Sequence, residues 1–212
     1  MCSGRVDLEF ILRAFANGQD GVFIGGCMLG ECNYVTHGNF DALANTYIAG
    51  KILERIGLNP DRLRIEFMSG ADGNLLAEYS DSFTKEIKKI GPLGRSEGMD
   101  EKDVKAKLDA ARKLVPYMRL VERERLRVPE KSKKAYTDFF ESSSINDLFD
   151  EIFNDRFAMG QIVSLLKTGP LSTADISEKL NMNPSDVSRH MIDSSRYGFV
   201  RYNTVKSCYE LA

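Results

Sequence analysis

Three of the four cysteines stand next to positions where strands are expected to end. Cys27 and Cys32 follow the continuous apolar run GVFIGG at 21–26, and Cys2 lies in the turn MCSGR that opens the chain. The carboxyl ends of parallel strands share one edge of a sheet, and open α/β folds bind their ligands there. Thiols that are distant in sequence are therefore expected to meet at this edge.

Thiolates gathered in this way suit a metal centre. The C-x4-C spacing of Cys27 and Cys32, with a third cysteine far away, is similar to the plant-type [2Fe–2S] arrangement, although no C-x2-C pair follows. Three glycines lie among them: Gly25, Gly26 and Gly30. Glycine permits close approach of a cluster and leaves backbone N–H groups free to bond its sulfides.

Two other interpretations of the cysteines stay open. Free cysteine is among the most buried residue types, so a pair near a strand end also fits simple packing. A structural zinc site needs a fourth ligand, for which the chain offers His37 in the polar turn YVTHGNF or Cys208 near the C-terminus. The polar turn favours exposure of His37, and Cys208 fits an isolated, half-buried thiol.

The first ninety residues alternate strand and helix. The apolar periodicity predicts helices at 6–16, 40–56 and 74–90 and strands at 21–26 and 62–70. This alternation predicts an α/β fold with parallel strands joined by right-handed crossovers. A parallel sheet of two strands is incomplete, because such strands are normally covered and flanked. We expect either a truncated N-terminus or an edge completed by a partner chain.

The segment GPLGRSEGM at 91–99 changes the composition to glycine, proline and polar residues and predicts a domain boundary. A long charged helix is expected over 100–128, kinked or divided at Pro116. Two short helical pieces around a serine cluster are expected over 129–154. We therefore predict an α/β domain at 1–94 and a helical connector at 95–154.

The last part of the chain, 155–212, has a signature of its own. Three helical segments end at Gly169, near Met182 and at Gly198, with Ser172 or Thr173 as an N-cap and Pro184 in a first helical turn. Two short strands around Asn203 and Thr204 finish the chain. Three helices and a two-stranded wing predict a winged helix-turn-helix domain.

Composition narrows the class of protein. Hydrophobic residues make up 42% and charged residues 28%, the balance of a globular protein. The sequence shows neither an apolar run near the roughly 20 residues of a membrane helix nor an export signal, so a cytoplasmic protein without a membrane partner is expected. The formal net charge of −2 gives no general attraction to nucleic acid. The sequence shows no phosphate-binding glycine loop and no nucleophile–base arrangement, which predicts a non-catalytic chain.

Several separated segments occur in the order of a known family. MCSGR, GGCMLGECNY, HGN, RLRIEFMSGADG and IGPLG together resemble the iron–sulfur delta subunit of methyl-viologen-reducing hydrogenase, over residues 1–94. The resemblance implies an electron-transfer subunit that carries a [2Fe–2S] cluster. It implies a hydrogenase or other electron-donor subunit and a heterodisulfide-reductase-like subunit as partners. Cys2, Cys27 and Cys32 are the ligands that it implies.

The sequence departs from the family in three places. Met28 and Asn33 stand where the family has histidines after the two cysteines of the second motif, and Glu31 replaces a frequent aspartate. The family also has a strand and a cysteine-rich turn before the MCSGR position. We therefore expect an N-terminal truncation, or a fourth cluster ligand that comes from elsewhere.

The C-terminal region suggests a different class of function, a redox-responsive winged-helix transcriptional regulator. The side chains that would contact DNA are Ser185, Ser188, Arg189, Arg196, Arg201 and Lys206. Residues 156–212 contain seven lysines and arginines and five acidic residues. This excess of positive charge is small for a domain that must contact several DNA phosphates. We therefore expect docking on a partner subunit rather than on nucleic acid. A third interpretation is a chain with three ordinary thiols and no cluster.

Overall fold

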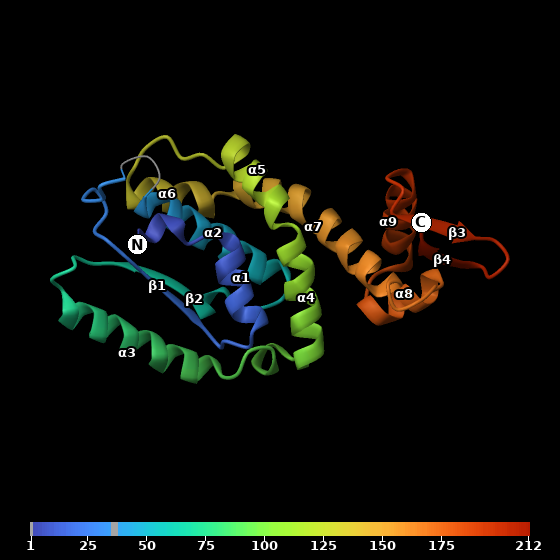
Figure 1. The fold of residues 1–212 in the computed structure, drawn as a ribbon, viewed down its shortest axis with the longest axis horizontal. Coiled ribbons are helices and arrows are strands. Elements are labelled where there is room, and N and C mark those ends of the chain that lie inside the picture. The colour runs from blue at the N-terminus through green and yellow to red at the C-terminus, as the bar shows by residue number, and fades with distance from the viewer. Residues whose placement is uncertain (1, 35–37) are drawn as a thin grey trace. The chain divides into compact units, whose positions relative to one another are not determined.

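The computed structural model describes residues 2–34 and 38–212 (Figure 1), so the candidate ligand His37 lies outside the described residues. The chain divides into two compact units, Met1–Leu148 and Phe149–Ala212. None of the helices in the described part combines the length and the hydropathy of a membrane-spanning segment. The two units are described in turn.

The N-terminal unit is built around a two-stranded parallel sheet, which confirms the predicted parallel pair. Strand β1 (Val22–Gly26) pairs with β2 (Leu63–Phe67) from Val22↔Leu63 to Gly26↔Phe67. The N–H of Met68 donates to the carbonyl of Gly26 over 2.9 Å and extends the pairing by one residue. Both strands therefore end at the same edge, β1 immediately before Cys27 and β2 immediately before Met68.

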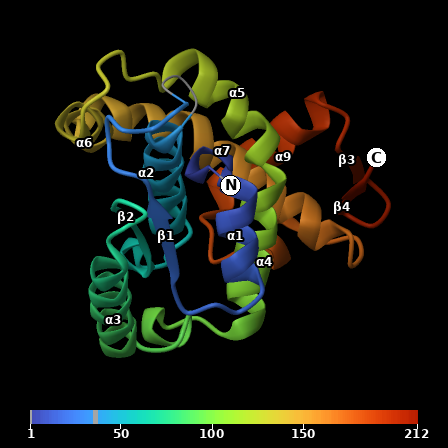
Figure 2. The ribbon, with the colours of Figure 1, turned by 60° about the vertical axis from the view of Figure 1, so that its left-hand side comes forward.

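Helices cover both faces of this sheet. Helix α3 (Gly73–Ile90) lies along one face, and α1 (Leu8–Ala16) and α2 (Asn39–Arg55) lie along the other (Figure 2). Helix α1 begins at Asp7, whose carboxylate accepts hydrogen bonds from the N–H groups of Glu9 and Phe10. The buried side chains of α1 are Leu8, Ile11, Leu12 and Phe15. Their three- and four-residue spacing places them on one apolar face.

Short helical turns and two charged helices also belong to this unit. They are η1 (Ser3–Arg5), η2 (Pro60–Arg62), η3 (Arg95–Glu97), α4 (Glu101–Lys113) and α5 (Val115–Arg125). The predicted division of the long charged helix is confirmed: α4 ends at Lys113, and Pro116 lies in the first turn of α5. Proline fits there because the N–H groups of a first helical turn have no intrahelical partner.

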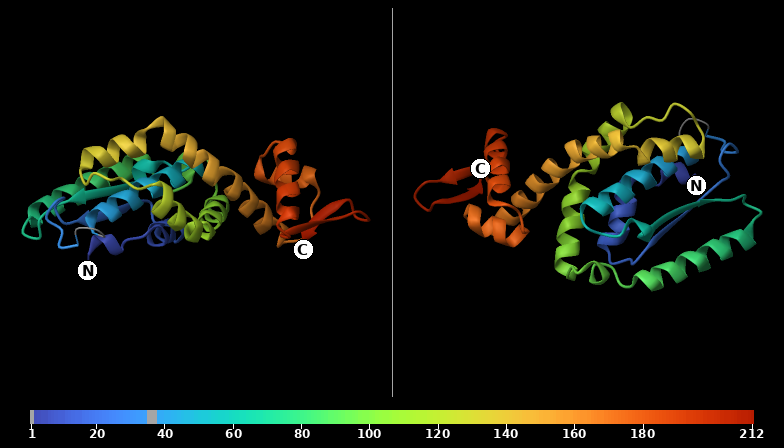
Figure 3. Two further views of the ribbon diagram at one scale, coloured as in Figure 1. Left: turned by 90° about the horizontal axis from the view of Figure 1, so that it is seen from above. Right: turned by 180° about the vertical axis from the view of Figure 1, so that it is seen from behind.

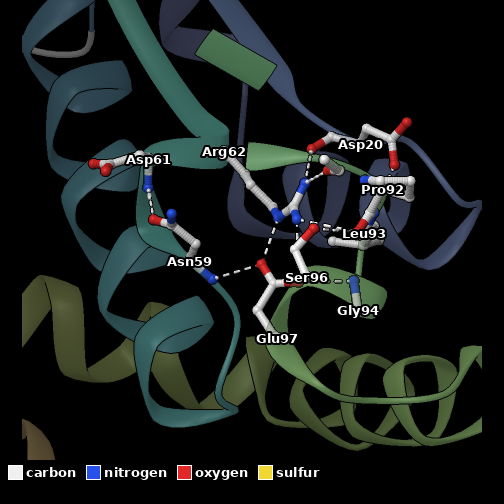
Figure 4. A network of polar contacts seen from close by, with 10 residues as sticks. Asp20, Asn59, Asp61, Arg62, Pro92, Leu93, Gly94, Ser96 and Glu97 are labelled. Atoms are coloured by element: carbon white, nitrogen blue, oxygen red, sulfur yellow. Dashed lines mark hydrogen bonds and ion pairs between the residues drawn. The ribbon is translucent and has the colours of Figure 1, made fainter. Parts of the chain in front are cut away.

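Arg62 anchors the segment that follows α3 (Figure 4). Its side chain is fully buried and forms an ion pair with Glu97, with 2.6 Å between Nε and Oε1. The same guanidinium donates to the carbonyls of Asp20, Gly91 and Pro92 over 2.8–3.2 Å. All three nitrogens of the guanidinium therefore donate hydrogen bonds, which compensates for the burial of its charge. The glycine-rich segment at 91–97 is thereby fastened to the beginning of β2.

The serine cluster separates two helices, as expected, but the second helix is longer than expected. Helix α6 (Lys133–Glu141) precedes Ser142, and α7 (Ser143–Leu166) follows it. The predicted boundary at 154/155 therefore falls inside α7, while the division between the two compact units falls at 148/149. Phe153 stacks on both Phe149 and Phe157, at 5.7 and 5.2 Å between ring centroids. Aromatic contacts at i, i+4 stabilise helix across this region.

The C-terminal unit continues from α7 with α8 (Thr173–Leu180), α9 (Pro184–Arg196) and the antiparallel hairpin of β3 (Val200–Asn203) and β4 (Cys208–Leu211). Figure 3 shows this hairpin beside α9. Ser172 is the N-cap of α8 and shares a capping box with Asp175. The buried core of the unit consists of Ile162, Leu166, Ile176, Val187, Met191 and Val200. The order of elements is the one expected of a winged helix-turn-helix domain, whose assignment remains a prediction.

Candidate metal centre

The three N-terminal cysteines belong to two neighbouring segments at the carboxyl edge of the sheet. Cys27 directly follows β1, Cys32 lies five residues later in the same loop, and Cys2 precedes η1. Helix η1 packs against both β1 and α2. Cys27 is exposed, while Cys2 and Cys32 are half-buried. Cys208 is buried in the other unit, in β4.

The sulfur of Cys32 is the hydrogen-bond acceptor of the group. The backbone N–H groups of Tyr34 and Asn39 bond this sulfur and lower the pKa of Cys32, and hydrogen bonds from the thiols of Cys27 and Cys2 contribute in the same direction. These contacts favour the thiolate, because they stabilise the charged form of the group. The loop after β1 and the turn before η1 therefore place the three cysteines on neighbouring segments.

The pKa of Cys27 moves the other way. Partial removal of its thiol from water is the main cause of the raised pKa, followed by its hydrogen bond to Cys32 and the charges of Cys32 and Cys2. Cys27 is nevertheless mostly exposed, so this desolvation is limited. Negative charge on these neighbouring sulfurs is mutually unfavourable unless a cation or another donor compensates it.

Asn39, the first residue of α2, fixes the loop that carries Cys27. Its buried side-chain amide donates to the carbonyl oxygens of Cys27 and Met28 over 2.9 and 2.8 Å. The same Nδ2 lies 3.6 Å from the sulfur of Cys27. The amide thus satisfies two carbonyls just past the end of β1 and also supplies an N–H to a candidate ligand.

Two glycines allow the close packing of these segments. A Cβ on Gly38 would lie 2.4 Å from both the sulfur of Cys32 and the carbonyl oxygen of Tyr34. A Cβ on Gly26 would lie 2.8 Å from the ring of Phe67. Real Cβ atoms do not approach that closely, so only glycine fits at either position.

The chemistry of this donor set suits iron and sulfide. Thiolate ligands select soft metals and iron–sulfur clusters, and N–H donors to sulfur are the usual surroundings of such clusters. Within residues 2–34 and 38–212, no group of three or more His, Cys, Asp or Glu side chains is arranged to hold a metal ion. The three thiols therefore suit a cluster in their chemistry, but the described residues do not show them arranged around a common metal position.

The sequence did not predict the roles of Gly38 and Asn39. Both belong to the HGN motif, which carries part of the family resemblance. The motif could be recognised in the sequence, but its contacts with the cysteine loop could not. Of the three glycines expected to pack closely, Gly26 does so, whereas Gly25 and Gly30 do not. A Cβ on Gly30 would meet no atom within 4 Å, and one on Gly25 would only touch Met68 at 4.0 Å.

Comparisons with known proteins show which families this chain resembles. Residues 1–91 match the family described as "Methyl-viologen-reducing hydrogenase, delta subunit", and residues 159–191 match "Bacterial regulatory protein, arsR family". An F420-non-reducing hydrogenase iron-sulfur subunit of Archaeoglobus profundus is 46% identical over 92 residues, which are 43% of this chain and 66% of that protein. The corresponding vhu iron-sulfur subunit of Methanococcus maripaludis is 40% identical over 91 residues, 43% of this chain and 67% of that protein.

A larger relative contains the same region. It is one of the subunits of the ferredoxin/F(420)H(2)-dependent CoB-CoM heterodisulfide reductase of Methanosarcina acetivorans, and it is 45% identical over 94 residues, which are 44% of this chain and 12% of that protein. The chain thus spans about two thirds of the hydrogenase subunits and a small part of the reductase subunit. In these three alignments the similarity covers less than half of the chain.

Proposed function

The chain belongs to the family of the methyl-viologen-reducing hydrogenase delta subunit, and from this premise we propose that it is a non-catalytic electron-transfer subunit. Its N-terminal unit carries a [2Fe–2S] cluster held by Cys2, Cys27 and Cys32. The cluster takes up and releases single electrons, and the reactions at either end belong to partner subunits.

The observation that supports this proposal is the placement of three cysteines on two neighbouring segments, the loop after β1 and the turn before η1, which packs against β1. The backbone N–H groups of Tyr34 and Asn39 lower the pKa of Cys32. Thiols that merely pack in a core would not need N–H donors aimed at their sulfurs. The names of the hydrogenase relatives, which are iron-sulfur subunits, support the same class of cofactor.

The residues of this chain have separate tasks in the proposed centre. The three cysteines bind iron, and the N–H groups of Tyr34 and Asn39 stabilise the thiolate of Cys32. The side chain of Asn39 holds the loop of Cys27 in place. A [2Fe–2S] centre takes four ligands, so a fourth ligand comes from outside these three cysteines.

The partners follow from the family. We propose a hydrogenase or another electron-donor subunit on one side and a heterodisulfide-reductase-like subunit on the other, because the relatives' names include both. Exposure of Cys27 supports a cluster near the surface, which a partner's redox centre can approach.

Reductive titration tests the function directly. The full chain is reconstituted anaerobically with iron and sulfide, and reduced methyl viologen is added stepwise while the visible absorption is recorded. We expect reversible uptake of one electron per chain, and no uptake by the Cys27→Ala variant. Colourless wild-type protein, or bleaching that oxidation does not reverse, would rule out an electron carrier.

A second candidate function, a redox-responsive regulator, is favoured by the arsR match of residues 159–191. We propose a winged helix-turn-helix domain for this region, supported by that match and by the order of its elements. Three of its candidate phosphate-binding cations, Arg189, Arg196 and Arg201, are already paired with carboxylates. Arg189 lies 3.3 Å from Asp155 and 3.6 Å from Asp186, and Arg196 lies 3.5 Å from Asp193.

On the wing, Arg201 pairs with Glu210 over 2.9 Å. Exposed pairs are weak, but each must be broken before the cation can serve a phosphate. We therefore favour docking on a partner subunit. Binding to DNA from the chain's own operon, measured from 50 to 200 mM salt, separates the two candidates. Tight binding that weakens steeply with salt would establish the regulator.

A further inference from the structure

Strand β2 has one side that pairs with β1 and one side that faces away from it. The N–H of Met68 donates to the carbonyl of Gly26, so the main-chain groups at even positions of β2 point toward β1. The N–H and C=O groups of Ile65 and Phe67 therefore point away from β1. Within residues 2–34 and 38–212, no hydrogen bond joins these outward groups to another residue. Such a row of free donors and acceptors can pair with a further strand.

Grooves run along both faces of this outer edge. On the face of α2, a groove of about 460 Å³ is lined by Leu63 and Ile65 of β2, together with Tyr47 of α2 and Phe140 of α6. On the face of α3, a second groove of about 370 Å³ is lined by Leu63 and Arg64 and by residues of α3. Figure 2 shows β2 between α6 and α3. The edge is therefore accessible to a strand from another chain.

The order of side chains in β2 is complementary to itself. The strand reads LRIEF, and antiparallel pairing with a second copy about Ile65 places Arg64 opposite the Glu66 of that copy. The same pairing places Leu63 opposite Phe67, so each apolar residue meets an apolar one. Opposite charges that face each other across an antiparallel pair stabilise it, whereas like charges destabilise it. Charged residues usually prevent pairing at a sheet edge, but in this order they favour a second copy of the same strand.

The side chain of Glu66 has no partner of its own. Arg64 lies on the α3 face of β2, where it pairs with Glu86 through Nη2 and lies 5.5 Å from the centre of the Phe83 ring. Glu66 is two positions further along the strand and so belongs to the same face. It is half-buried and forms no hydrogen bond or ion pair with another described residue. The guanidinium of Arg64 has N–H donors beyond the one that Glu86 uses, so it can bind a second carboxylate.

We propose that the chain forms a homodimer in which the β2 strands of two copies pair antiparallel about a two-fold axis at Ile65. The N–H and C=O of Ile65 in each copy exchange hydrogen bonds with those of the other, and Arg64 pairs with Glu66 twice. Two sheets of two strands thereby become one sheet of four, a usual size. Strand β1 contains no charged residue, so its side chains specify no such register. The dimer goes beyond the proposed function and does not require the cluster.

Sedimentation of the metal-free full chain, with a reductant to prevent disulfides, tests this dimer over a wide range of concentration. The variants are Arg64→Glu, Glu66→Arg and the control Glu124→Arg, which changes the charge equally at an exposed position on α5. Each of the first two variants places like charges opposite each other in both cross-strand pairs. We expect a dimer for the wild type and the control, and an affinity at least about tenfold weaker for each of the other two.

Mixing the two variants makes the test specific to this strand pairing. In the mixture, one chain presents only carboxylates at the two positions and the other only guanidiniums, so both cross-strand pairs are attractive again. We expect a heterodimer in the mixture, with circular dichroism to show that each variant is folded. A monomeric wild type, a mixture of folded variants that stays monomeric, or variants that dimerise as tightly as the wild type would each overturn the proposal. The last outcome would place the contact on another surface, such as the outer edge of β1.

Hydrogen exchange of the wild type decides the question even where a variant does not fold. The outward N–H groups of Ile65 and Phe67 should exchange slowly at high protein concentration and fast at low concentration, because only the dimer protects them. The N–H of Glu66 points toward β1 and should stay protected throughout. NMR spectroscopy resolves the individual amides. Fast exchange of Ile65 at every concentration would contradict the dimer, and failure of the chain to bind iron and sulfide would leave it unaffected.

Discussion

The side-chain amide of Asn39 lies 3.6 Å from the sulfur of Cys27 and donates to the backbone carbonyl of the same residue over 2.9 Å. One residue at the start of α2 therefore fixes the backbone at the end of β1 and supplies an N–H to a candidate ligand. Because the residues are twelve positions apart, this contact depends on the crossover that carries the chain from β1 into α2.

Replacing Asn39 by alanine should destabilise the metal-free protein. The change removes the hydrogen bonds to the carbonyls of Cys27 and Met28, each of which contributes roughly 0.5–1.5 kcal/mol. Denaturant unfolding measures this loss. Asn33→Ala, at an exposed position in the same loop, serves as a control that should stay within about 0.5 kcal/mol of the wild type. Equal stability of the two variants would mean that the amide does not hold the loop.

Alkylation should distinguish the three N-terminal cysteines from Cys208. In the metal-free native protein, Cys2, Cys27 and Cys32 should react with iodoacetamide, while the buried Cys208 should react only after unfolding. Reconstitution with iron and sulfide should protect the first three together, because a ligated sulfur is no longer a free nucleophile. Mass spectrometry of the digested protein locates each modification. Protection of only one or two of them would argue against a shared site.

Replacing Arg62 by alanine should cost roughly 3–5 kcal/mol, because it leaves the buried carboxylate of Glu97 without its cation. Three backbone carbonyls also lose their donor. The control is Lys134→Ala, which removes an exposed i,i+4 pair with Asp138, because exposed pairs contribute little to stability. Chemical denaturation of both variants gives the comparison, and similar losses would contradict the anchoring role of Arg62.

The ion pair of Glu97 should make stability depend on pH in the acid range. Burial alone would raise the pKa of Glu97, but hydrogen bonds from Arg62 and from the N–H groups of Asn59 and Gly94 outweigh it and lower the pKa. A carboxylate with a lowered folded-state pKa stabilises the protein above its unfolded pKa of about 4.3, and this stability is lost as the pH falls through the folded value.

The Glu97→Gln variant should therefore be less stable than the wild type at pH 7, and the difference should shrink as the pH falls below about 4. Unfolding curves at several pH values measure this difference. A stability gap that stays constant from pH 7 to pH 3 would show that the charge of Glu97 contributes nothing.

The sequence predicted the elements whose residues carry a clear period. The apolar run before Cys27 and the alternating segment at 62–70 became β1 and β2, and the expected helix at 74–90 became α3 with a one-residue difference at its start. Pro116 was sufficient to predict the division between α4 and α5. These signals are local, because each depends on residues within a few positions of one another.

Local sequence patterns of this kind did not predict the length of α7 or the residues that surround the cysteines. The helix continues through the expected boundary because its aromatic side chains stack at i, i+4, whereas the composition there only suggested a connector. The contacts of Asn39 with Cys27, of Gly38 with Cys32 and of Ser3 with Gly26 join segments that are separate in sequence. Only the folded crossovers bring such residues together, so periodicity and spacing do not reveal them.

Mössbauer and EPR spectroscopy of the reconstituted full chain test the central claim most directly, that Cys2, Cys27 and Cys32 hold one [2Fe–2S] cluster. The account predicts two irons and two sulfides per chain, a diamagnetic oxidised state and one unpaired electron after one-electron reduction. Each single alanine variant of these cysteines should lose this signal, and Cys208→Ala should keep it. A wild-type chain without coupled iron, or a signal that survives in Cys2→Ala, Cys27→Ala or Cys32→Ala, would contradict the account.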